Sequence, residues 1–380
     1  MSDRQGRRLK VTFAIPSLAG GGAERVAVQV LNALDSERWD RSIFLFERRG
    51  PYLADLSPSI KVRNATTVSR LGRWRALRRF IRSERPDVIV AFLSYLSVLS
   101  AARAAAVGSR VVFAIGTPVT AFLADTDYRW SGVFSRRLFS RALRIGISFA
   151  DLIVATSRGV ADDLVRTFGG THQRVRIVHN PVDVGAVAIA AREPIDEADA
   201  ARWHAPVVVA AGRLAEAKNY PLLIDAFAIL RQRTPASLFI LGQGDQEAAM
   251  RALIADRHLT ESVHLCGFRR NPWSYIARAD VFALTSRYEG FGNVLIEAMA
   301  CGVPVVATAS PGTREIVTSG ADGLIVENHE PAAFASALAR VLDDPALRRC
   351  MAETAGRHAE QYRTESIAQA YDRVLSEVIA

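Results

Sequence analysis

The segment SRYEGFGNVLIEAMACG, residues 286–302, has the pattern of a sharp turn that follows a strand and opens a helix. An apolar run precedes the segment, two glycines flank Phe291 in its turn, and a helical composition follows from Asn293. Strand, glycine-rich turn and helix in that order form the βα unit of a parallel sheet. A plain helix cap needs no second glycine, so we expect the turn to bring its backbone close to a ligand.

The same alternation of short β-branched runs and helical stretches extends over the rest of the chain. In the front half we predict strands at Lys10–Pro16, Arg41–Phe46, Asp87–Ala91, Val111–Ile115 and Leu152–Ala155, with helices at Ala23–Leu34 and Arg70–Ser83. In the back half we predict strands at Val207–Ala211, Ala236–Leu241, His264–Cys266, Val281–Thr285, Pro304–Ala307 and Asp322–Val326, with helices at Tyr220–Arg233, Gln246–Leu259, Asn293–Ala300 and Pro331–Leu342. This pattern is typical of doubly wound parallel sheets. The predicted fold class is α/β, with two tandem Rossmann-like domains facing a cleft.

A stretch rich in Ala, Glu and Asp, without either periodicity, separates the two series. We predict an N-terminal domain at 1–185, a linker at 186–204, a C-terminal domain at 205–362 and a final helix at 363–380. The final segment has apolar residues at helical spacing, namely Ile367, Ala370, Tyr371, Val374, Leu375 and Val378. We expect this last helix to cross back to the N-terminal domain.

The composition excludes several classes of protein. With 380 residues, 49% hydrophobic and 23% charged, the chain has the composition of a soluble globular protein rather than a disordered one. Its cysteines, Cys266, Cys301 and Cys350, have neither disulfide nor metal-ligand spacing, which favours a reduced cytosol. The longest apolar stretch, Val88–Ala102, falls short of the roughly 18 residues of a membrane span. We predict a buried strand followed by a packed helix there.

Two glutamates of the opening segment, Glu289 in the turn and Glu297 in the helix, lie eight positions apart. The free backbone amides of Asn293, Val294 and Leu295 are expected to point from the helix N-terminus towards a diphosphate, which the helix dipole favours. Glu297 is placed to accept hydrogen bonds from a ribose diol. The turn and helix are therefore predicted to bind a nucleoside diphosphate.

With Glu-Gly-Phe-Gly before Glu297 and Met-Ala-Cys-Gly-Val-Pro-Val after it, this pattern closely resembles glycosyltransferase family 4, whose members are retaining enzymes of the two-Rossmann-domain (GT-B) fold. The resemblance covers nearly the whole chain. Other segments similar to the family's motifs are Gly20-Gly-Gly-Ala-Glu-Arg25, His179-Asn-Pro-Val-Asp183, Gly212-Arg-Leu-Ala-Glu-Ala-Lys-Asn219, Leu241-Gly-Gln-Gly244 and Leu265-Cys-Gly-Phe268. One such motif is weak, whereas this many in the family's order are specific.

Carried over position by position, the resemblance implies that Arg213 and Lys218 neutralise the departing diphosphate and that Glu289 contacts hydroxyls of the donor sugar. Positioned cations stabilise the charge that develops on a leaving group. The donor-binding residues that the resemblance implies are Gly21, Gly22, Gly267, Phe268, Phe291, Gly292, Asn293, Val294, Leu295 and Glu297. Within that set, Gly267 and Phe268 are expected along the base, and the first two glycines near the phosphate or the transferred sugar.

The first half departs from the family in one respect. Many members have a histidine there that faces the reacting sugar, but this chain has no histidine before His172. Thr117, near the end of the corresponding strand, occupies that place without an assigned role. Asp125-Thr-Asp127 mimics the Asp-x-Asp metal site of the other large glycosyltransferase fold, yet it lacks further acidic partners nearby, which favours a helix cap. We predict neither a metal nor a cofactor besides the nucleotide-sugar substrate.

The activity implied is metal-independent, retaining transfer of a hexose or N-acetylhexosamine, with a UDP-sugar as the expected donor and GDP left open. The acceptor is expected to be a glycan or a lipid-linked molecule. Two alternatives remain, a nucleotide-sugar epimerase of the same fold and a basic scaffold that binds membranes or nucleic acid without catalysis. A nicotinamide or flavin site in the Gly20–Gly22 loop is disfavoured, because Arg25 occupies the third glycine position of the dinucleotide motif.

The net charge of +9 is concentrated in the front half. Residues 1–185 hold 29 Lys and Arg against 15 Asp and Glu, whereas residues 186–380 hold 19 against 24. Arginines alternate with apolar residues in 70–85 and 129–144. We interpret the apolar stripes as packing on the sheet, and the arginine excess as a surface for an anionic membrane. The predicted location is the cytoplasm, with peripheral contact at the inner face of the membrane as a hypothesis. No nucleic-acid partner is expected, because no recognition motif accompanies the charge.

Overall fold

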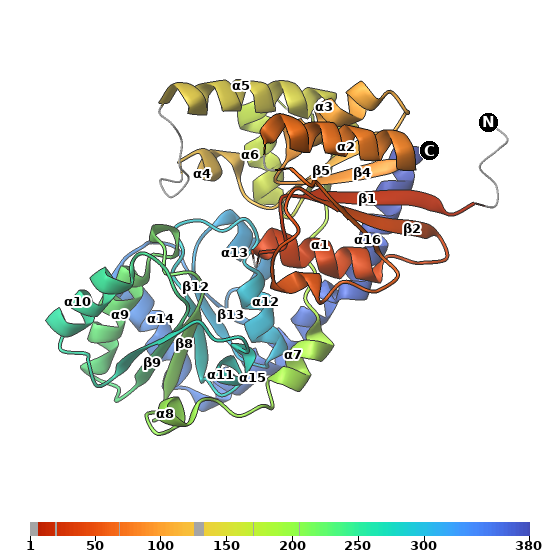
Figure 1. Ribbon diagram of the computed structural model, residues 1–380. Helices are drawn as coiled ribbons and strands as arrows, with labels where there is room; N and C mark the ends of the chain where they lie inside the picture. Colours follow the sequence, from red (N-terminus) through yellow and green to blue (C-terminus); the bar gives the residue numbers. More distant parts are fainter. Residues whose placement is uncertain (1–6, 20, 68, 125–132, 170, 205) are drawn as a thin grey trace. The chain divides into compact units, whose positions relative to one another are not determined.

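The computed structural model describes residues 7–19, 21–67, 69–124, 133–169, 171–204 and 206–380, which form two compact units (Figure 1). Unit 1 holds the chain up to Pro181 together with Thr364–Ala380, and unit 2 is Val182–Arg363. Residues 186–204, predicted as a linker, belong to unit 2 instead. The reason is that Val184 and Val187 of helix α7 (Val184–Ala190) are buried in the core of unit 2.

Unit 1 is built on a parallel sheet in the order β3-β2-β1-β4-β5-β6-β7. The strands are β1 (Leu9–Ile15), β2 (Trp39–Leu45), β3 (Lys61–Asn64), β4 (Val88–Phe92), β5 (Arg110–Ile115), β6 (Leu152–Ala155) and β7 (Val175–Ile177). All five residues of β4 are buried, as expected for a central strand covered on both faces.

Helices cover both faces of this sheet. They are α1 (Gly22–Ala33), α2 (Arg70–Glu84), α3 (Tyr95–Ala105), α4 (Val119–Ala124), α5 (Val133–Phe149), α6 (Arg158–Phe168) and α16 (Thr364–Ile379). One core layer contains Leu77 and Ile81 of α2, and the other contains Val30 of α1 with Tyr371 and Leu375 of α16. Helices α1 and α16 lie side by side on that second face (Figure 1). Segments from both ends of the chain thus complete the core of unit 1.

Unit 2 has a parallel sheet in the order β10-β9-β8-β11-β12-β13. Its strands are β8 (Val207–Ala211), β9 (Ser237–Leu241), β10 (Val263–Gly267), β11 (Val281–Leu284), β12 (Val305–Thr308) and β13 (Gly323–Val326). Its helices after α7 are α8 (Glu197–Ala200), α9 (Tyr220–Arg231), α10 (Glu247–Asp256), α11 (Trp273–Ile276), α12 (Asn293–Ala300), α13 (Pro311–Ile316), α14 (Pro331–Leu342) and α15 (Pro345–Ala359). The two sheets match the predicted pair of Rossmann-like domains.

Strands β3 and β7 were not predicted, because these edge strands contain polar residues in place of an apolar run. The stretch from Val88 to Ala102 forms β4 and most of α3, as predicted. Within the described residues, no helix combines the length and the apolar character that a membrane span requires.

The centre of the sheet in unit 2 is the place where a ligand site is expected. Strands β8 and β11 are neighbours there, although far apart in the sequence. The chain leaves β8 into α9 on one face of the sheet and leaves β11 into α12 on the opposite face. In such sheets, ligands bind beyond the carboxyl ends of the two strands at which the helices diverge. The loops after β8 and β11 are therefore the candidate site.

Candidate active site

Two hydrogen bonds hold the loop after β8 against the loop after β11. The amide of Arg287 donates to the carbonyl of Ala217 at 2.8 Å, and the hydroxyl of Thr285 donates to the carbonyl of Lys218 at 3.1 Å. Because the bonds join the two loops directly, the side chains that follow β8 are fixed relative to those that follow β11.

The bonded loops bring together two residues that are 71 positions apart in the sequence. The ammonium of Lys218 donates to Oε1 of Glu289 at 2.5 Å, and Ser286 Oγ donates to the same oxygen at 2.7 Å. The Glu289 side chain is 12% exposed and that of Lys218 is 25% exposed. An ammonium has three donors, so Lys218 can hold Glu289 and also donate to an anion. The pair thus presents a cation and a carboxylate at the point where the ligand is expected.

The loop that contains Lys218 has a backbone that only glycine adopts easily. Gly212 has φ +151°, and the hydroxyl of Tyr220 donates to its carbonyl at 3.2 Å. Burial raises the pKa of Tyr220, so its hydroxyl remains a donor at any physiological pH. Arg213 follows with an exposed side chain, as its predicted role requires.

The glycines of the Leu241-Gly-Gln-Gly244 segment are explained by packing of backbone on backbone. A Cβ atom at Gly242 would lie 1.9 Å from the carbonyl oxygen of Gly212, and one at Gly244 would lie 2.2 Å from that of Leu214. The amide of Leu214 also donates to the carbonyl of Gln243 at 2.9 Å. The backbone of this segment therefore packs directly against the loop that contains Arg213 and Lys218.

The loop after β10 lies at the same carboxyl edge of the unit 2 sheet. The amide of Gly242 donates to the carbonyl of Gly267 at 2.8 Å, and Gly267 has φ +68°. Phe268, which follows, is 67% exposed. An exposed aromatic ring at the carboxyl edge of the sheet can stack on a planar base. Phe268 was predicted to lie along the base.

The turn before α12 differs from the sequence prediction at the amide of Leu295. Gly292 has φ +96° and caps the helix, which accounts for a glycine there. The amide of Leu295 donates to the carbonyl of Gly292 at 2.9 Å, so it is not free for a diphosphate as predicted. The ring of Phe291 is 2% exposed and packs edge-on against Tyr362 at 5.6 Å between ring centroids. Only the backbone of Phe291 is left to contact a ligand.

The first residues of helix α12, Asn293 and Val294, are half-buried at the same edge of the sheet.

Helix α13 supports the Glu289 turn and was not recognised in the sequence. A Cβ at Gly312 would lie 2.7 Å from the carbonyl oxygen of Glu289, so only glycine permits this contact. Ser310 and Thr313 form a capping box that fixes the start of the helix. The Ser-Pro-Gly-Thr sequence was the available signal, because it combines a cap with proline in the first turn.

Glu297 is buried, with 7% exposure, and its carboxylate has a partner that sequence reasoning missed. The indole Nε1 of Trp273 donates to Glu297 Oε2 at 2.9 Å. Trp273 begins α11, which packs against α12. The indole therefore fixes the orientation of the carboxylate that was predicted to bind a ribose.

In unit 1, the predicted glycines lie at the start of α1. Gly21 is the N-cap residue of this helix, and both Gly21 and Gly22 are exposed. A Cβ at Gly22 would meet no protein atom within 4 Å, so packing inside the described residues does not explain a glycine there. Thr117 follows β5 and is exposed. Asp125 and Asp127 lie outside the described residues.

Two family profiles match the chain in succession. The profile described as Glycosyltransferase Family 4 matches residues 20–186, and the one described as Glycosyl transferases group 1 matches residues 192–358. Among solved structures, HepE of Anabaena in complex with UDP gives a TM-score of 0.80 at 21% identity, covering 97% of this chain and 100% of that one. Sucrose-phosphate synthase of Thermosynechococcus elongatus gives 0.80 at 19% identity, covering 98% and 99%. These likenesses confirm the predicted GT-B fold.

Two relatives are named for sugar transfer. An N-acetylgalactosamine-N,N'-diacetylbacillosaminyl-diphospho-undecaprenol 4-alpha-N-acetylgalactosaminyltransferase of Campylobacter jejuni is 36% identical over 221 residues, a match that spans only 58% of each chain. The lipopolysaccharide core biosynthesis glycosyltransferase LpsE of Rhizobium meliloti is 28% identical over 365 residues, 94% of this chain and 96% of that protein. With both profiles matched in order over nearly the whole length, the chain belongs to glycosyltransferase family 4.

Proposed function

We propose that the protein transfers a hexose or N-acetylhexosamine from a UDP-sugar to a glycan or lipid-linked acceptor, with retention and without a metal. The observation that carries this proposal is the Lys218–Glu289 pair, held at the carboxyl ends of β8 and β11. The structure of HepE with UDP supports the choice of nucleotide. The names of the relatives from Campylobacter jejuni and Rhizobium meliloti support a lipid-linked or glycan acceptor.

The proposed chemistry assigns each group a separate task. As the bond between the sugar C1 and the diphosphate oxygen breaks, Lys218 and Arg213 stabilise the charge on the leaving diphosphate. Glu289 uses the oxygen that Lys218 and Ser286 leave open, Oε2, to accept hydrogen bonds from sugar hydroxyls. The acceptor oxygen bonds to C1 on the same face, and its proton passes to the leaving phosphate oxygen. The protein itself then needs no general base.

Calorimetric titration with UDP, GDP and ADP, each with and without EDTA, tests the donor site. We expect selective UDP binding that EDTA does not change. Glu297→Ala should weaken this binding about 10- to 100-fold, because hydrogen bonds to a charged group contribute roughly 1.5–3 kcal/mol. Selective binding of GDP or dependence on a metal would contradict the proposal in that detail. If none of the nucleotides bound, the non-catalytic scaffold would replace the enzyme as the preferred function.

Trp273→Phe tests whether the indole orients Glu297 towards the ribose. We expect UDP affinity to fall about three- to tenfold, because one hydrogen bond to the carboxylate is lost. The affinity for 2′,3′-dideoxy-UDP, which lacks the diol, should change little. Trp203→Phe is a matched control, since Trp203 packs on Phe239 in the same unit. Equal losses for both nucleotides would show that Trp273 only supports the fold.

A membrane surface is the second part of the proposed function, and helix α5 is its basis. Leu138, Ile145 and Phe149 are 59%, 59% and 61% exposed and share one helical face, as their spacing of seven and four residues shows. Exposed Arg141 and Arg144 belong to the same helix. An apolar face with adjoining arginines suits the interface of an anionic bilayer. In contrast, Leu77 and Ile81 of α2 pack on the sheet, as predicted for the apolar stripes. For Leu71 of the first stripe and Leu138 of the second, that prediction is wrong, because both are exposed.

Co-sedimentation with phosphatidylcholine vesicles, with and without phosphatidylglycerol, tests this surface. The double variant Ile145→Ser, Phe149→Ser should reduce binding to the anionic vesicles about tenfold, because it removes apolar area from the contact. Ile189→Ser is the control, since Ile189 is 72% exposed in unit 2. An equal loss in both variants, or none in the double variant, would exclude α5 as the membrane contact.

A further inference from the structure

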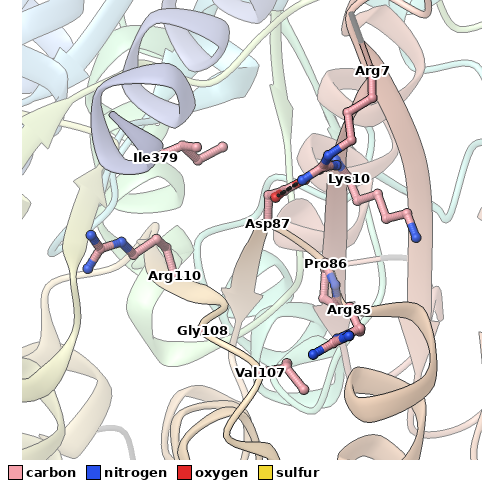
Figure 2. A pocket seen from close by; sticks show the side chains of 9 residues that line it. All are labelled: Arg7, Lys10, Arg85, Pro86, Asp87, Val107, Gly108, Arg110 and Ile379. Atoms are coloured by element: carbon pink, nitrogen blue, oxygen red, sulfur yellow. Dashed lines mark hydrogen bonds and ion pairs between the residues drawn. The ribbon is translucent and has the colours of Figure 1, made fainter. Parts of the chain in front are cut away.

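Unit 1 has a pocket of about 500 Å³ at the edge of its sheet where the strands begin (Figure 2). Arg7 and Lys10 line it from the start of β1, Asp87 from the position before β4, and Arg110 from the first residue of β5. Arg85, at the end of α2, also lines it. Ligands of such sheets bind at the opposite, carboxyl edge, so this pocket is separate from the site of sugar transfer.

Among the described residues that line the pocket, Asp87 is the one acidic residue, and its charge is already neutralised. Both terminal nitrogens of Arg7 donate to Asp87, at 2.6 and 2.9 Å, and the amide of Lys10 donates to the same carboxylate at 2.8 Å. Asp87 therefore has little capacity left to balance the other cations. Figure 2 shows those cations, Lys10, Arg85 and Arg110, around the Arg7–Asp87 pair.

Acidic side chains of the described residues neutralise the charges of the three remaining cations only in part. The Lys10 ammonium donates to the neutral carbonyl of Glu84 at 2.8 Å. Arg110 contacts Asp151 at 3.2 Å but shares that carboxylate with Arg103, also at 3.2 Å. The Arg85 side chain is exposed, and within the described part of the chain it makes neither a hydrogen bond nor an ion pair.

We propose that this pocket binds a phosphate group. Arginine forks match the geometry of phosphate oxygens, and an ammonium adds a point charge. A cavity of this volume also has room for a small molecule that bears the phosphate. Both a soluble phosphate and a phosphomonoester lipid headgroup have this chemistry. The site lies wholly in unit 1, so its occupancy neither requires nor reports donor binding in unit 2.

The test compares the thermal unfolding of the wild type in inorganic phosphate with that in sodium chloride of equal ionic strength. A ligand that binds only the folded protein raises its Tm, and at a given concentration the increase is larger when the Kd is lower. Arg85→Ala should weaken the phosphate effect about tenfold in apparent Kd. Arg82→Ala removes the same charge from an exposed position one turn earlier on α2, outside the pocket lining, and should retain the effect.

Two further arms separate the site from others and identify the source of the phosphate. Lys218→Ala should keep the phosphate effect, whereas Arg85→Ala should keep UDP binding. Vesicles that contain phosphatidic acid are offered to the wild type, to Arg85→Ala and to Arg82→Ala. If Arg85→Ala loses binding to the vesicles, the ligand is a lipid headgroup. If Arg85→Ala loses only the stabilisation by free phosphate, the ligand is a soluble phosphate. Equal responses of Arg85→Ala and Arg82→Ala in both arms, or no response in the wild type, would overturn the proposal.

Discussion

Lys218→Ala is expected to lower kcat/KM for sugar transfer by about 10²–10³-fold, the usual effect of removing one positioned donor to a developing anion. The ammonium lies 2.5 Å from Glu289 Oε1, so the variant also leaves that carboxylate without its counter-ion. The hydroxyls of the donor sugar would then donate hydrogen bonds to a less well oriented Glu289 carboxylate. The measurement is release of UDP from the UDP-sugar that binds best in the titration.

Two further variants show whether the Lys218 effect is specific. Lys218→Arg keeps the charge and should recover part of the activity, whereas Arg251→Ala removes a cation from an exposed ion pair on α10 and should have no effect. Thermal unfolding of each variant confirms that it is folded. Activity of Lys218→Ala within twofold of the wild type would remove the pair from the mechanism.

Truncation after Arg363 is expected to abolish the cooperative unfolding of unit 1. The truncation removes α16, whose Tyr371 and Leu375 are 1% and 0% exposed in the core. It also removes Asp372, which accepts hydrogen bonds from the Trp39 indole at 2.5 Å and from Arg38 at 2.7 Å. Even Leu375→Ala alone should cost about 2–5 kcal/mol, the usual range for a buried leucine.

Differential scanning calorimetry checks the effect of the truncation. The transition of unit 2 should persist, because the truncated residues belong to unit 1, and UDP binding should persist with it. Gln369→Ala is the control within α16, since Gln369 is exposed. An unchanged transition of unit 1 after truncation would show that the helix contributes little to the core.

The strands that carry the site were predictable, because a buried parallel sheet has an unmistakable pattern of short apolar runs. The glycine turns were predictable for a similar reason, and Gly292 at φ +96° confirms why one was needed. The sequence could not reveal the direct bond between Lys218 and Glu289. Their proximity depends on the neighbouring positions of β8 and β11 in the sheet, which local patterns do not specify.

Residues that position other residues of the site were not predicted from the sequence either. Trp273 and Gly312 have no local signature of function, since one orients a carboxylate on another helix and the other permits a close backbone contact. Residues 186–204 were predicted as a linker because they lack a strong periodicity. Their few apolar side chains nevertheless suffice to fix α7 in the core of unit 2.

The division of unit 1 between the two ends of the chain has a consequence for synthesis on the ribosome. The first 181 residues emerge long before α16 is made, so the face of α1 and β2 that α16 covers stays open to solvent in the nascent chain. Unit 2 is continuous and can close first, as domains generally fold in units during translation. Completion of the unit 1 core therefore waits for the last segment of the chain, and the nascent first half is the stage at which a chaperone would be most useful.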